Sequence, residues 1–248
     1  MQTTAILFAV ALWAGMQNAL AGGGSFVTLP ALILSGLDAR AANIASTIAL
    51  FPGQVTTGLV GRRSVSGVAG LPFRALAAIS LVGGVIGAGL LLATPSTFFA
   101  RLVPWLVLFA TALFAWGAFR KQGSAEPRLG PRLAGVLQFL IAVYGGYFGG
   151  GVSILMLAAF TAAGVAVRAA GATKNVLSSV MNASAVAVFL FTPAIPWPRV
   201  AVVCVGAIVG GFVGAHLLKR VDERLIRGFV IVLGLVLTVG LFLRAGKA

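Results

Sequence analysis

Two stretches of the 248-residue chain, AGGGSFVTLPALIL (residues 21–34) and FGGGVSILMLAAF (residues 148–160), each place a glycine triplet inside an apolar segment. Glycine destabilises a helix interior by about 1 kcal/mol relative to alanine, so a triplet is expected to interrupt the helix. In lipid, the freed backbone groups must find partners in protein, water or a bound ligand. Helices broken at matching places in two halves of a membrane protein are typical of a binding site between the halves.

The composition around these stretches is that of a membrane protein. Hydrophobic residues make up 60% of the chain and charged residues 9%, against about 45–50% and about 25% in typical soluble domains. The sequence therefore predicts an all-helical polytopic membrane protein and excludes soluble enzymes, nucleic-acid binders and secreted disulfide scaffolds. The net charge of +14 comes from lysines and arginines scattered between apolar blocks, as in membrane-protein loops. We expect these blocks at residues 4–37, 41–60, 71–93, 102–119, 133–165, 170–191, 200–218 and 225–243.

Residues for metal or acid–base chemistry are scarce. Cys204 and His216 are the only cysteine and histidine, which excludes an internal disulfide and a histidine or cysteine metal cluster. Without intramembrane carboxylates, the acid relay of many proton- or sodium-driven carriers is not expected, nor is a protease-like triad. We therefore predict no enzyme, no metal and no cofactor. The acidic residues, all in predicted loops, are Asp38, Glu126, Asp222 and Glu223.

The two glycine stretches belong to an internal duplication. Gly22–Gly24 correspond to Gly149–Gly151 at an offset of 127, and Arg40 corresponds to Arg168 at an offset of 128. Polar residues inside the apolar blocks match as well, for example Gln54 with Asn182. We predict two homologous four-segment repeats that each open with a glycine-broken helix. The predicted boundaries are residues 1–119 for the first repeat, 120–132 for a polar linker and 133–248 for the second repeat.

The orientation of the repeats depends on whether each glycine-interrupted block crosses the membrane or returns to the side it entered. If each block crosses, the lysines and arginines are spread almost evenly over the two sides. If each block is a hairpin, most of them gather on one side, which the positive-inside rule favours. The hairpin interpretation predicts inverted repeats and places both termini outside the cytoplasm.

The glycine triplets are the first candidate for a site. A short helix that starts after each triplet would present free N–H groups to an anion, and Ser25 and Ser153 could add hydroxyl donors. The alternative is that such glycines only allow helices to pack closely. We expect that packing role for glycines outside the triplets, namely Gly83, Gly87, Gly206, Gly210 and Gly214.

Lys174 is the second candidate, because it lies in an apolar stretch with no acid nearby. A bound anion would supply its counter-charge; the alternative is a lysine that extends to the lipid headgroups. Neighbouring amides and hydroxyls recur at helical spacing and either donate to an anion or bond between helices. The candidate substrate-binding residues are Asn18, Gly22, Gly23, Gly24, Ser25, Thr47, Gln54, Gly149, Gly150, Gly151, Ser153, Lys174, Asn175 and Asn182.

Three motifs of the second half resemble a known family. They are YFGGGVSILML (residues 147–157), A-x-G-x-T-K-N at Ala169–Asn175, and G-x-x-x-G-G-x-x-G-A at Gly206–Ala215. The chain resembles the sulfite exporter TauE/SafE family of membrane permeases over nearly its whole length. The resemblance implies transport of small sulfur-containing anions, such as sulfite or organosulfonates, and export across the bacterial inner membrane.

We therefore predict a secondary transporter or facilitator whose partners are a small anionic substrate and the lipid bilayer, with no nucleic acid and with homodimer formation left open. An importer of sulfur oxyanions or small carboxylates would share every feature above. A membrane scaffold or an intramembrane enzyme is the more distant alternative.

Overall fold

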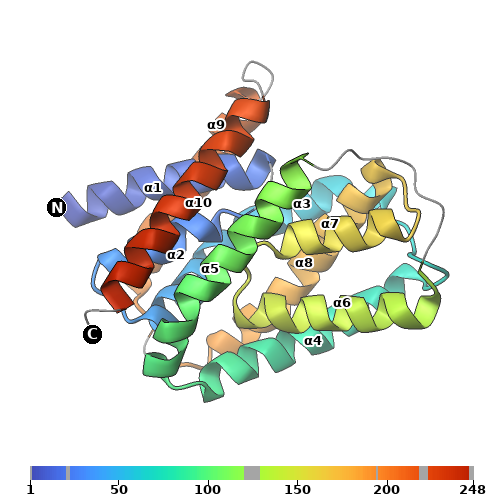
Figure 1. The fold of residues 1–248 in the computed structure, drawn as a ribbon, viewed down its shortest axis with the longest axis horizontal. Helices are drawn as coiled ribbons and strands as arrows, with labels where there is room; N and C mark the ends of the chain where they lie inside the picture. Colours follow the sequence, from blue (N-terminus) through green and yellow to red (C-terminus); the bar gives the residue numbers. More distant parts are fainter. Residues whose placement is uncertain (1, 21–22, 120–128, 194, 218–222, 246–248) are drawn as a thin grey trace.

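The computed structural model describes residues 2–20, 23–119, 129–193, 195–217 and 223–245 (Figure 1). Within these ranges the chain forms ten α-helices, one short 3-10 turn at Arg62–Ser64 and one isolated β-bridge between Val68 and Leu71. The predicted all-helical fold is therefore confirmed. The helices are α1 (Gln2–Leu20), α2 (Ser25–Leu34), α3 (Ala39–Gly61), α4 (Phe73–Ala93), α5 (Ser96–Phe119), α6 (Pro131–Tyr147), α7 (Val152–Ala162), α8 (Val167–Phe189), α9 (Trp197–Leu217) and α10 (Glu223–Ala245).

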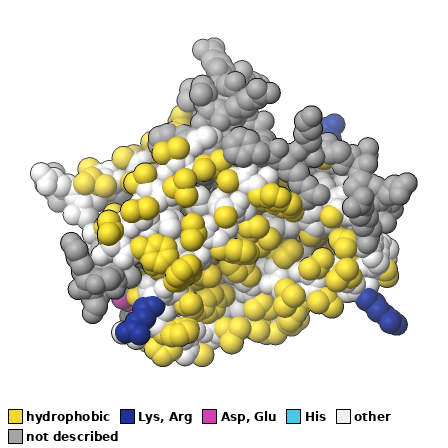
Figure 2. Space-filling view, in the orientation of Figure 1, with side chains coloured by type: hydrophobic (Ala, Val, Ile, Leu, Met, Phe, Trp, Pro, Cys, Tyr) yellow, Lys and Arg dark blue, Asp and Glu magenta, His cyan; other side chains and the backbone are white. Residues whose placement is uncertain are grey.

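The outside of the helix bundle is apolar and polar side chains lie inside it. Among the described helices, α4 and α5 are long and apolar enough over 21 residues each to cross a membrane. Helices α3 and α8 have 23 residues each, about 34 Å at 1.5 Å per residue, but carry buried polar side chains such as Asn43 and Asn182. Figure 2 shows hydrophobic side chains spread over much of the described part of one face, with lysine or arginine side chains at its edges. This distribution suits a lipid environment.

Both glycine triplets interrupt a helix, as predicted. The first break separates α1 from α2 and the second separates α6 from α7. Gly23 has φ of +86°, and Gly149 and Gly151 have φ of +81° and +74°. Residues other than glycine rarely adopt these angles, so the chain can turn sharply here. Gly22 lies outside the described residues.

The second break turns the chain back on itself. Near the start of α6, Gly135 packs beside Leu71. Near the start of α8, the Thr173 Oγ1 accepts a hydrogen bond of 2.9 Å from the Ser66 N–H. The two ends of the α6–α7 unit therefore meet at the loop of residues 62–72, so this unit is a hairpin. We call this end of the bundle the Ser66 end.

The first break forms a second hairpin that opens at the other end of α4, which we call the Thr94 end. Thr3 at the start of α1 and Ser35 after α2 border one small cavity. Arg40, at the start of α3, donates hydrogen bonds of 3.1 and 3.0 Å to the carbonyl oxygens of Leu92 and Thr94. The two hairpins thus open at opposite ends of the bundle.

The packing of the helices is preserved when the two halves are exchanged. Helices α1, α3, α4 and α5 of the first half correspond to α6, α8, α9 and α10 of the second. The contact of α1 with α9 is matched by that of α6 with α4, and α3 and α5 each contact their own counterparts, α8 and α10. The bounds of α3 and α8 differ by 128 residues at both ends (39 and 167, 61 and 189). Helices α5 and α10 run antiparallel: the rings of Trp105 and Phe242 meet edge to face with centroids 5.0 Å apart, and Thr111 lies beside Gly234.

Glycines outside the triplets allow the closest helix contacts. A Cβ atom at Gly87 would overlap the carbonyl oxygen of Val143 in α6, and one at Gly210 would overlap that of Leu12 in α1. A Cβ atom at Gly83 would lie 2.6 Å from the Ala142 Cβ in α6, and one at Gly206 would lie 2.7 Å from the Ala11 Cβ in α1. The predicted packing role is confirmed for these four glycines, whereas the packing around Gly214 lies outside what the structure describes.

Candidate binding site

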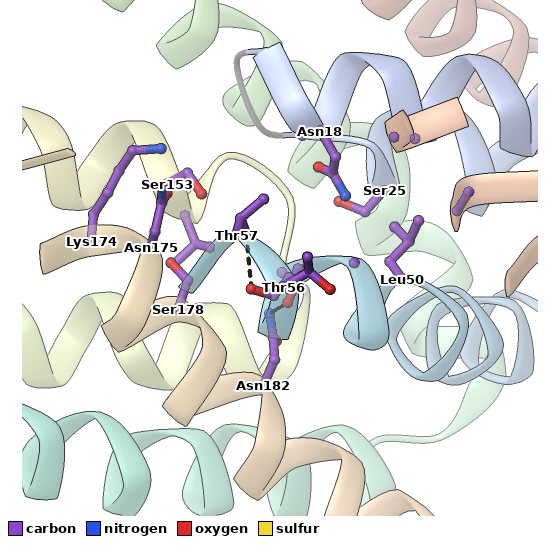
Figure 3. Close-up of a pocket in the computed structure, with 18 of the residues that line it drawn as sticks. Asn18, Ser25, Leu50, Thr56, Thr57, Ser153, Lys174, Asn175, Ser178 and Asn182 are labelled. Carbon is purple, nitrogen blue, oxygen red and sulfur yellow. Dashed lines mark hydrogen bonds between the residues drawn. The ribbon is translucent and has the colours of Figure 1, made fainter. Parts of the chain in front are cut away.

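A cavity of about 460 Å³ lies between the two helix breaks (Figure 3). Residues from α1, α2, α3, α7, α8 and α9 border it. Lys174, Asn175, Ser178 and Asn182 follow one another along α8 and face Asn18 and Ser25 across the cavity. The predicted site residues that line the cavity are Asn18, Gly23, Ser25, Gln54, Gly149, Gly151, Ser153, Lys174, Asn175 and Asn182.

Three predicted site residues lie away from the cavity lining. The Gly24 N–H donates to the Asn18 Oδ1 at 2.8 Å, so Gly24 positions a lining side chain. The carbonyl of Gly150 accepts a hydrogen bond from the Tyr144 hydroxyl within its own hairpin. The Thr47 hydroxyl donates to the Asn43 carbonyl at 2.9 Å, one turn earlier in α3.

Two side chains hold the breaks in their bent conformation. The Gln17 Nε2 donates to the Gly23 carbonyl at 3.1 Å, and the Tyr144 hydroxyl donates to the Gly150 carbonyl at 2.7 Å. Each donor lies six residues before its acceptor, and both pairs are related by the offset of 127 between the halves. Sequence analysis missed this role of Gln17 and Tyr144. The signal that could have found them is a hydrogen-bond donor six residues before the middle glycine.

The N-termini of α2 and α7 both reach the cavity through Ser25 and Ser153. Among the described residues, no acceptor bonds the backbone N–H of Ser25, Val152 or Ser153. Free N–H groups at a helix N-terminus, together with the helix dipole, favour a negatively charged ligand. The two breaks therefore present donors to the same space.

Lys174 is the sole charged side chain among the described residues that line the cavity. It lies seven residues into α8, about 10 Å along the helix axis. Ser178 and Asn182 follow at intervals of four residues, so all three side chains share one face of α8. This face thus offers one positive charge followed by neutral polar groups, and no carboxylate repels an anion there.

Gln54 and Asn182, which the duplication matches to each other, meet in the cavity wall. The Asn182 Nδ2 donates to the Gln54 Oε1. The Gln54 backbone carbonyl also accepts hydrogen bonds of 2.8 Å from the hydroxyls of Thr57 and Ser179. The bonds from Asn182 and Ser179 connect α8 to α3, whereas the bond from Thr57 lies within α3.

The cavity is open at the Ser66 end. Val60 and Phe212, which lie near the C-terminal ends of α3 and α9, border it and are 83% and 68% exposed. The lining contributed by α9 also includes Ala207, Ile208 and Gly211. Sequence analysis missed this wall, because small apolar residues look the same whether they pack against a helix or border a cavity.

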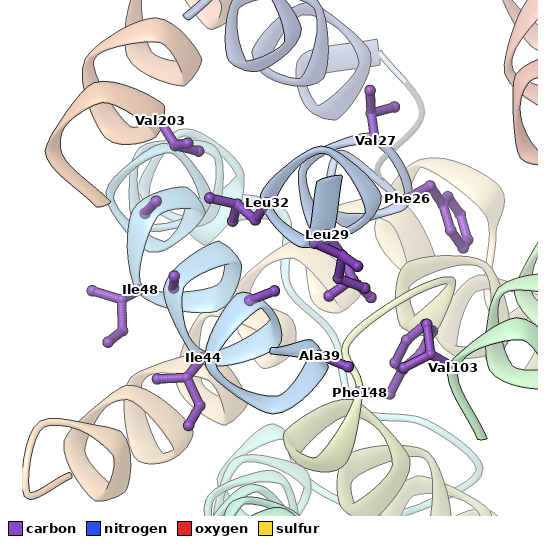
Figure 4. Packing of buried hydrophobic residues seen from close by; sticks show 14 of the residues in the cluster. Phe26, Val27, Leu29, Leu32, Ala39, Ile44, Ile48, Val103, Phe148 and Val203 are labelled. Atoms are coloured by element: carbon purple, nitrogen blue, oxygen red, sulfur yellow. The ribbon is translucent and has the colours of Figure 1, made fainter. Parts of the chain in front are cut away.

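The Thr94 end is closed by packed side chains. The hydroxyls of Thr28 and Ser46 are hydrogen-bonded at 2.6 Å, and the Asn43 Nδ2 donates to the Tyr147 carbonyl at 3.1 Å. A cluster of buried hydrophobic residues, which includes Leu29 and Phe148, packs around α2 (Figure 4). Among the described residues, packed side chains therefore separate the cavity from the Thr94 end.

The described residues contain no group of three or more histidine, cysteine, aspartate or glutamate side chains that could hold a metal ion. The cavity lining offers a single lysine, amides, hydroxyls and backbone N–H groups. Such a set of donors can bind an anion by charge and hydrogen bonds.

Comparisons with known proteins identify relatives over most of the chain. The sequence model described as Sulfite exporter TauE/SafE matches residues 7–241. A "Probable membrane transporter protein" of Haemophilus influenzae is 28% identical over 241 residues, 94% of this chain and 92% of the relative. The "Probable membrane transporter protein ORF9" of a Sinorhizobium species is 30% identical over 243 residues, 96% of this chain and 91% of the relative.

The "Probable membrane transporter protein YfcA" of Escherichia coli is 25% identical over 236 residues, 94% of this chain and 87% of the relative. The family description and these names denote membrane transporters and not enzymes. The resemblance found in the sequence motifs is thereby confirmed. This chain is a multi-pass membrane protein that belongs to the sulfite exporter TauE/SafE family.

Proposed function

We propose that this protein moves small sulfur-containing anions, such as sulfite and organosulfonates, across the bacterial inner membrane in the export direction. The observation that carries the proposal is the cavity between the two helix breaks, where Lys174 is the one charged side chain in the described lining. A lysine without a carboxylate partner needs a counter-charge in a membrane protein. A bound anion supplies it, with help from the helix N-termini at Ser25 and Ser153.

The proposed architecture is a pair of inverted repeats. Helices α3 and α8 have matching bounds and run antiparallel, since Gln54 meets Asn182 and Ser66 meets Thr173. Two hairpins that open at opposite ends of the bundle fit the same relation. In such transporters the substrate lies near the middle of the membrane between the repeats.

We assign the Ser66 end to the cytoplasm. Arginines are concentrated there, and the positive-inside rule places such loops on the cytoplasmic side. Both chain termini are then extracytoplasmic, and the cavity is open to the cytoplasm. The arginines of the described residues at this end are Arg62, Arg63, Arg74, Arg132, Arg168, Arg224 and Arg227.

In this proposal, export proceeds by alternating access. An anion enters from the cytoplasm and binds at Lys174, and one repeat then rocks against the other to open the Thr94 end. The described lining offers no carboxylate to carry a coupling proton. The membrane potential can supply the driving force, since a monoanion leaving a negative interior gains about 2.3 kcal/mol per 100 mV.

Flux through reconstituted proteoliposomes tests this function. Vesicles loaded with sulfite or isethionate should release it faster when a potassium gradient with valinomycin makes the interior negative. Vesicles that contain the Lys174→Met protein should release the anion no faster than protein-free liposomes loaded with the same anion. Release that ignores the imposed potential would reject potential-driven export, and flux in the opposite direction alone would identify an importer.

A further inference from the structure

An arginine of the second half binds the end of α2 at the closed Thr94 end. Arg199 lies in the first turn of α9, is half-buried, and its Nη2 donates to the Ser35 carbonyl at 3.2 Å. Ser35 is the first residue after α2. The last carbonyls of a helix have no partner within the helix, and the helix dipole makes this end negative, so an arginine there is stabilising. The bond joins the two halves of the chain.

Helix α7 ends in the same local structure at the Ser66 end. Ala163, which follows α7, corresponds to Ser35 at the offset of 128, and Gly164 corresponds to Gly36. Both glycines have a left-handed backbone, with φ of +95° at Gly36 and +81° at Gly164, and each N–H donates to a carbonyl of its helix at 3.0 Å. The Ala163 carbonyl, however, accepts no hydrogen bond from a described residue. Of these two matching helix ends, the one at the closed end of the bundle binds an arginine.

Arg74 is the counterpart of Arg199, because it lies in the first turn of α4, the helix that corresponds to α9. Its side chain is exposed and makes no hydrogen bond with another described residue. Its neighbour Phe73 packs against the hydrophobic cluster that contains Ala163, so the start of α4 lies near the end of α7. At the open Ser66 end, the arginine and the carbonyl of an equivalent bond are therefore both present but not bonded.

We propose that Arg74 and the Ala163 carbonyl form a latch that holds the Ser66 end closed while the Thr94 end is open. The bond between Arg199 and Ser35 breaks in the same step, so each state of the transporter keeps one arginine latch at its closed end. The two halves exchange their contacts in this way because inverted repeats rock against each other during alternating access. This inference rests on the proposed function, since it needs a protein that opens at either end.

A cysteine at position 46 reports the opening of the Thr94 end. Ser46 is 1% exposed, and its hydroxyl is hydrogen-bonded to Thr28 in the closed end. At the offset of 128 it corresponds to Lys174, which lines the cavity of the present state, so position 46 should border the cavity of the opposite state. In purified protein with a Cys204→Ser background, the rate at which Ser46→Cys reacts with a water-soluble maleimide then follows the population of that state.

Removing each arginine should move this reaction rate in opposite directions. Arg199→Met removes the latch of the present state and should raise the rate about 2–13-fold, the range for one net hydrogen bond. Arg74→Met removes the latch of the opposite state and should lower the rate by a similar factor. With both substitutions the rate should return to within about threefold of that of Ser46→Cys alone, because the two losses offset each other. Arg132→Met, which removes an exposed arginine from the first turn of α6, is the control and should leave the rate unchanged.

A rate that Arg74→Met leaves unchanged or raises would overturn the latch, as would a rate that Arg199→Met does not raise. A general loosening of the fold increases the rate, so it does not imitate the slower reaction expected of Arg74→Met. In these cases, anion release from proteoliposomes that still depends on Lys174 would leave the proposed function standing. If wild-type proteoliposomes release no anion and Ser46→Cys never reacts, the proposed function fails and the latch fails with it.

Discussion

Removing the charge of Lys174 is the most direct perturbation of the cavity. Methionine has a similar length and volume, so Lys174→Met takes away the ammonium group and leaves the packing of α8 largely as it is. Lys174 provides the one charge in the described lining. We expect the affinity for every anion to fall, whichever anion is the natural substrate.

The size of the loss follows from the electrostatics of a partly enclosed pair. Two unit charges about 4 Å apart interact by about 4 kcal/mol at an effective dielectric constant of about 20. The loss of hydration of both ions offsets part of this attraction. Hydrogen bonds to charged groups contribute about 1.5–3 kcal/mol net, which corresponds to about 10–150-fold in Kd.

The assay is calorimetric titration of isethionate and sulfite into purified wild-type and Lys174→Met protein at low and physiological salt. Arg168→Gln is the matched control, because it removes an exposed positive charge from the first turn of the same helix, away from the cavity. The control should stay within about twofold of wild type, since salt screens exposed charges. Wild-type affinity in Lys174→Met protein would refute an anion site anchored by this lysine.

Two further predictions concern the break and the open end of the cavity. Gly151→Ala should lower the free energy of unfolding by about 1–2 kcal/mol, because alanine is strained at a φ of +74°; thermal unfolding in detergent would measure it. Gly89→Ala, with open space around a new Cβ, is the control and should not destabilise the protein. In a Cys204→Ser background, Thr57→Cys should react with a water-soluble maleimide, since Thr57 lines the cavity, whereas Leu29→Cys, 1% exposed, should not. A Gly151→Ala protein as stable as the wild type, or a Thr57→Cys protein that does not react with the maleimide, would contradict the described geometry.

The sequence was sufficient for the helices and for the breaks, because strong local physics determines both. Apolar blocks of about 20 residues predicted the segments, and α3 at Ala39–Gly61 differs from the expected 41–60 by one or two residues. Three consecutive glycines destabilise a helix enough to interrupt it. The distribution of loop charges favours hairpins, and the inverted relation of the two halves stays a prediction.

The sequence did not predict that matched positions of the two repeats contribute unequally to the cavity. Duplicated signals predict equivalent roles for Thr47 and Asn175, yet Asn175 borders the cavity and Thr47 is bonded within the closed half. Likewise, the repeats match Gln54 with Asn182, but only tertiary packing brings the two side chains together.

The meeting of Gln54 and Asn182 has a consequence for how the site can change over generations. If two separate, identical polypeptides formed this bundle, the same codon would encode both side chains, and every mutation would alter both at once. Fusing the halves into one gene gives each position its own codon. One position can then hold the longer amide and the other the shorter one. A single-base change can thus retune one side of the site while the opposite side keeps its ancestral residue.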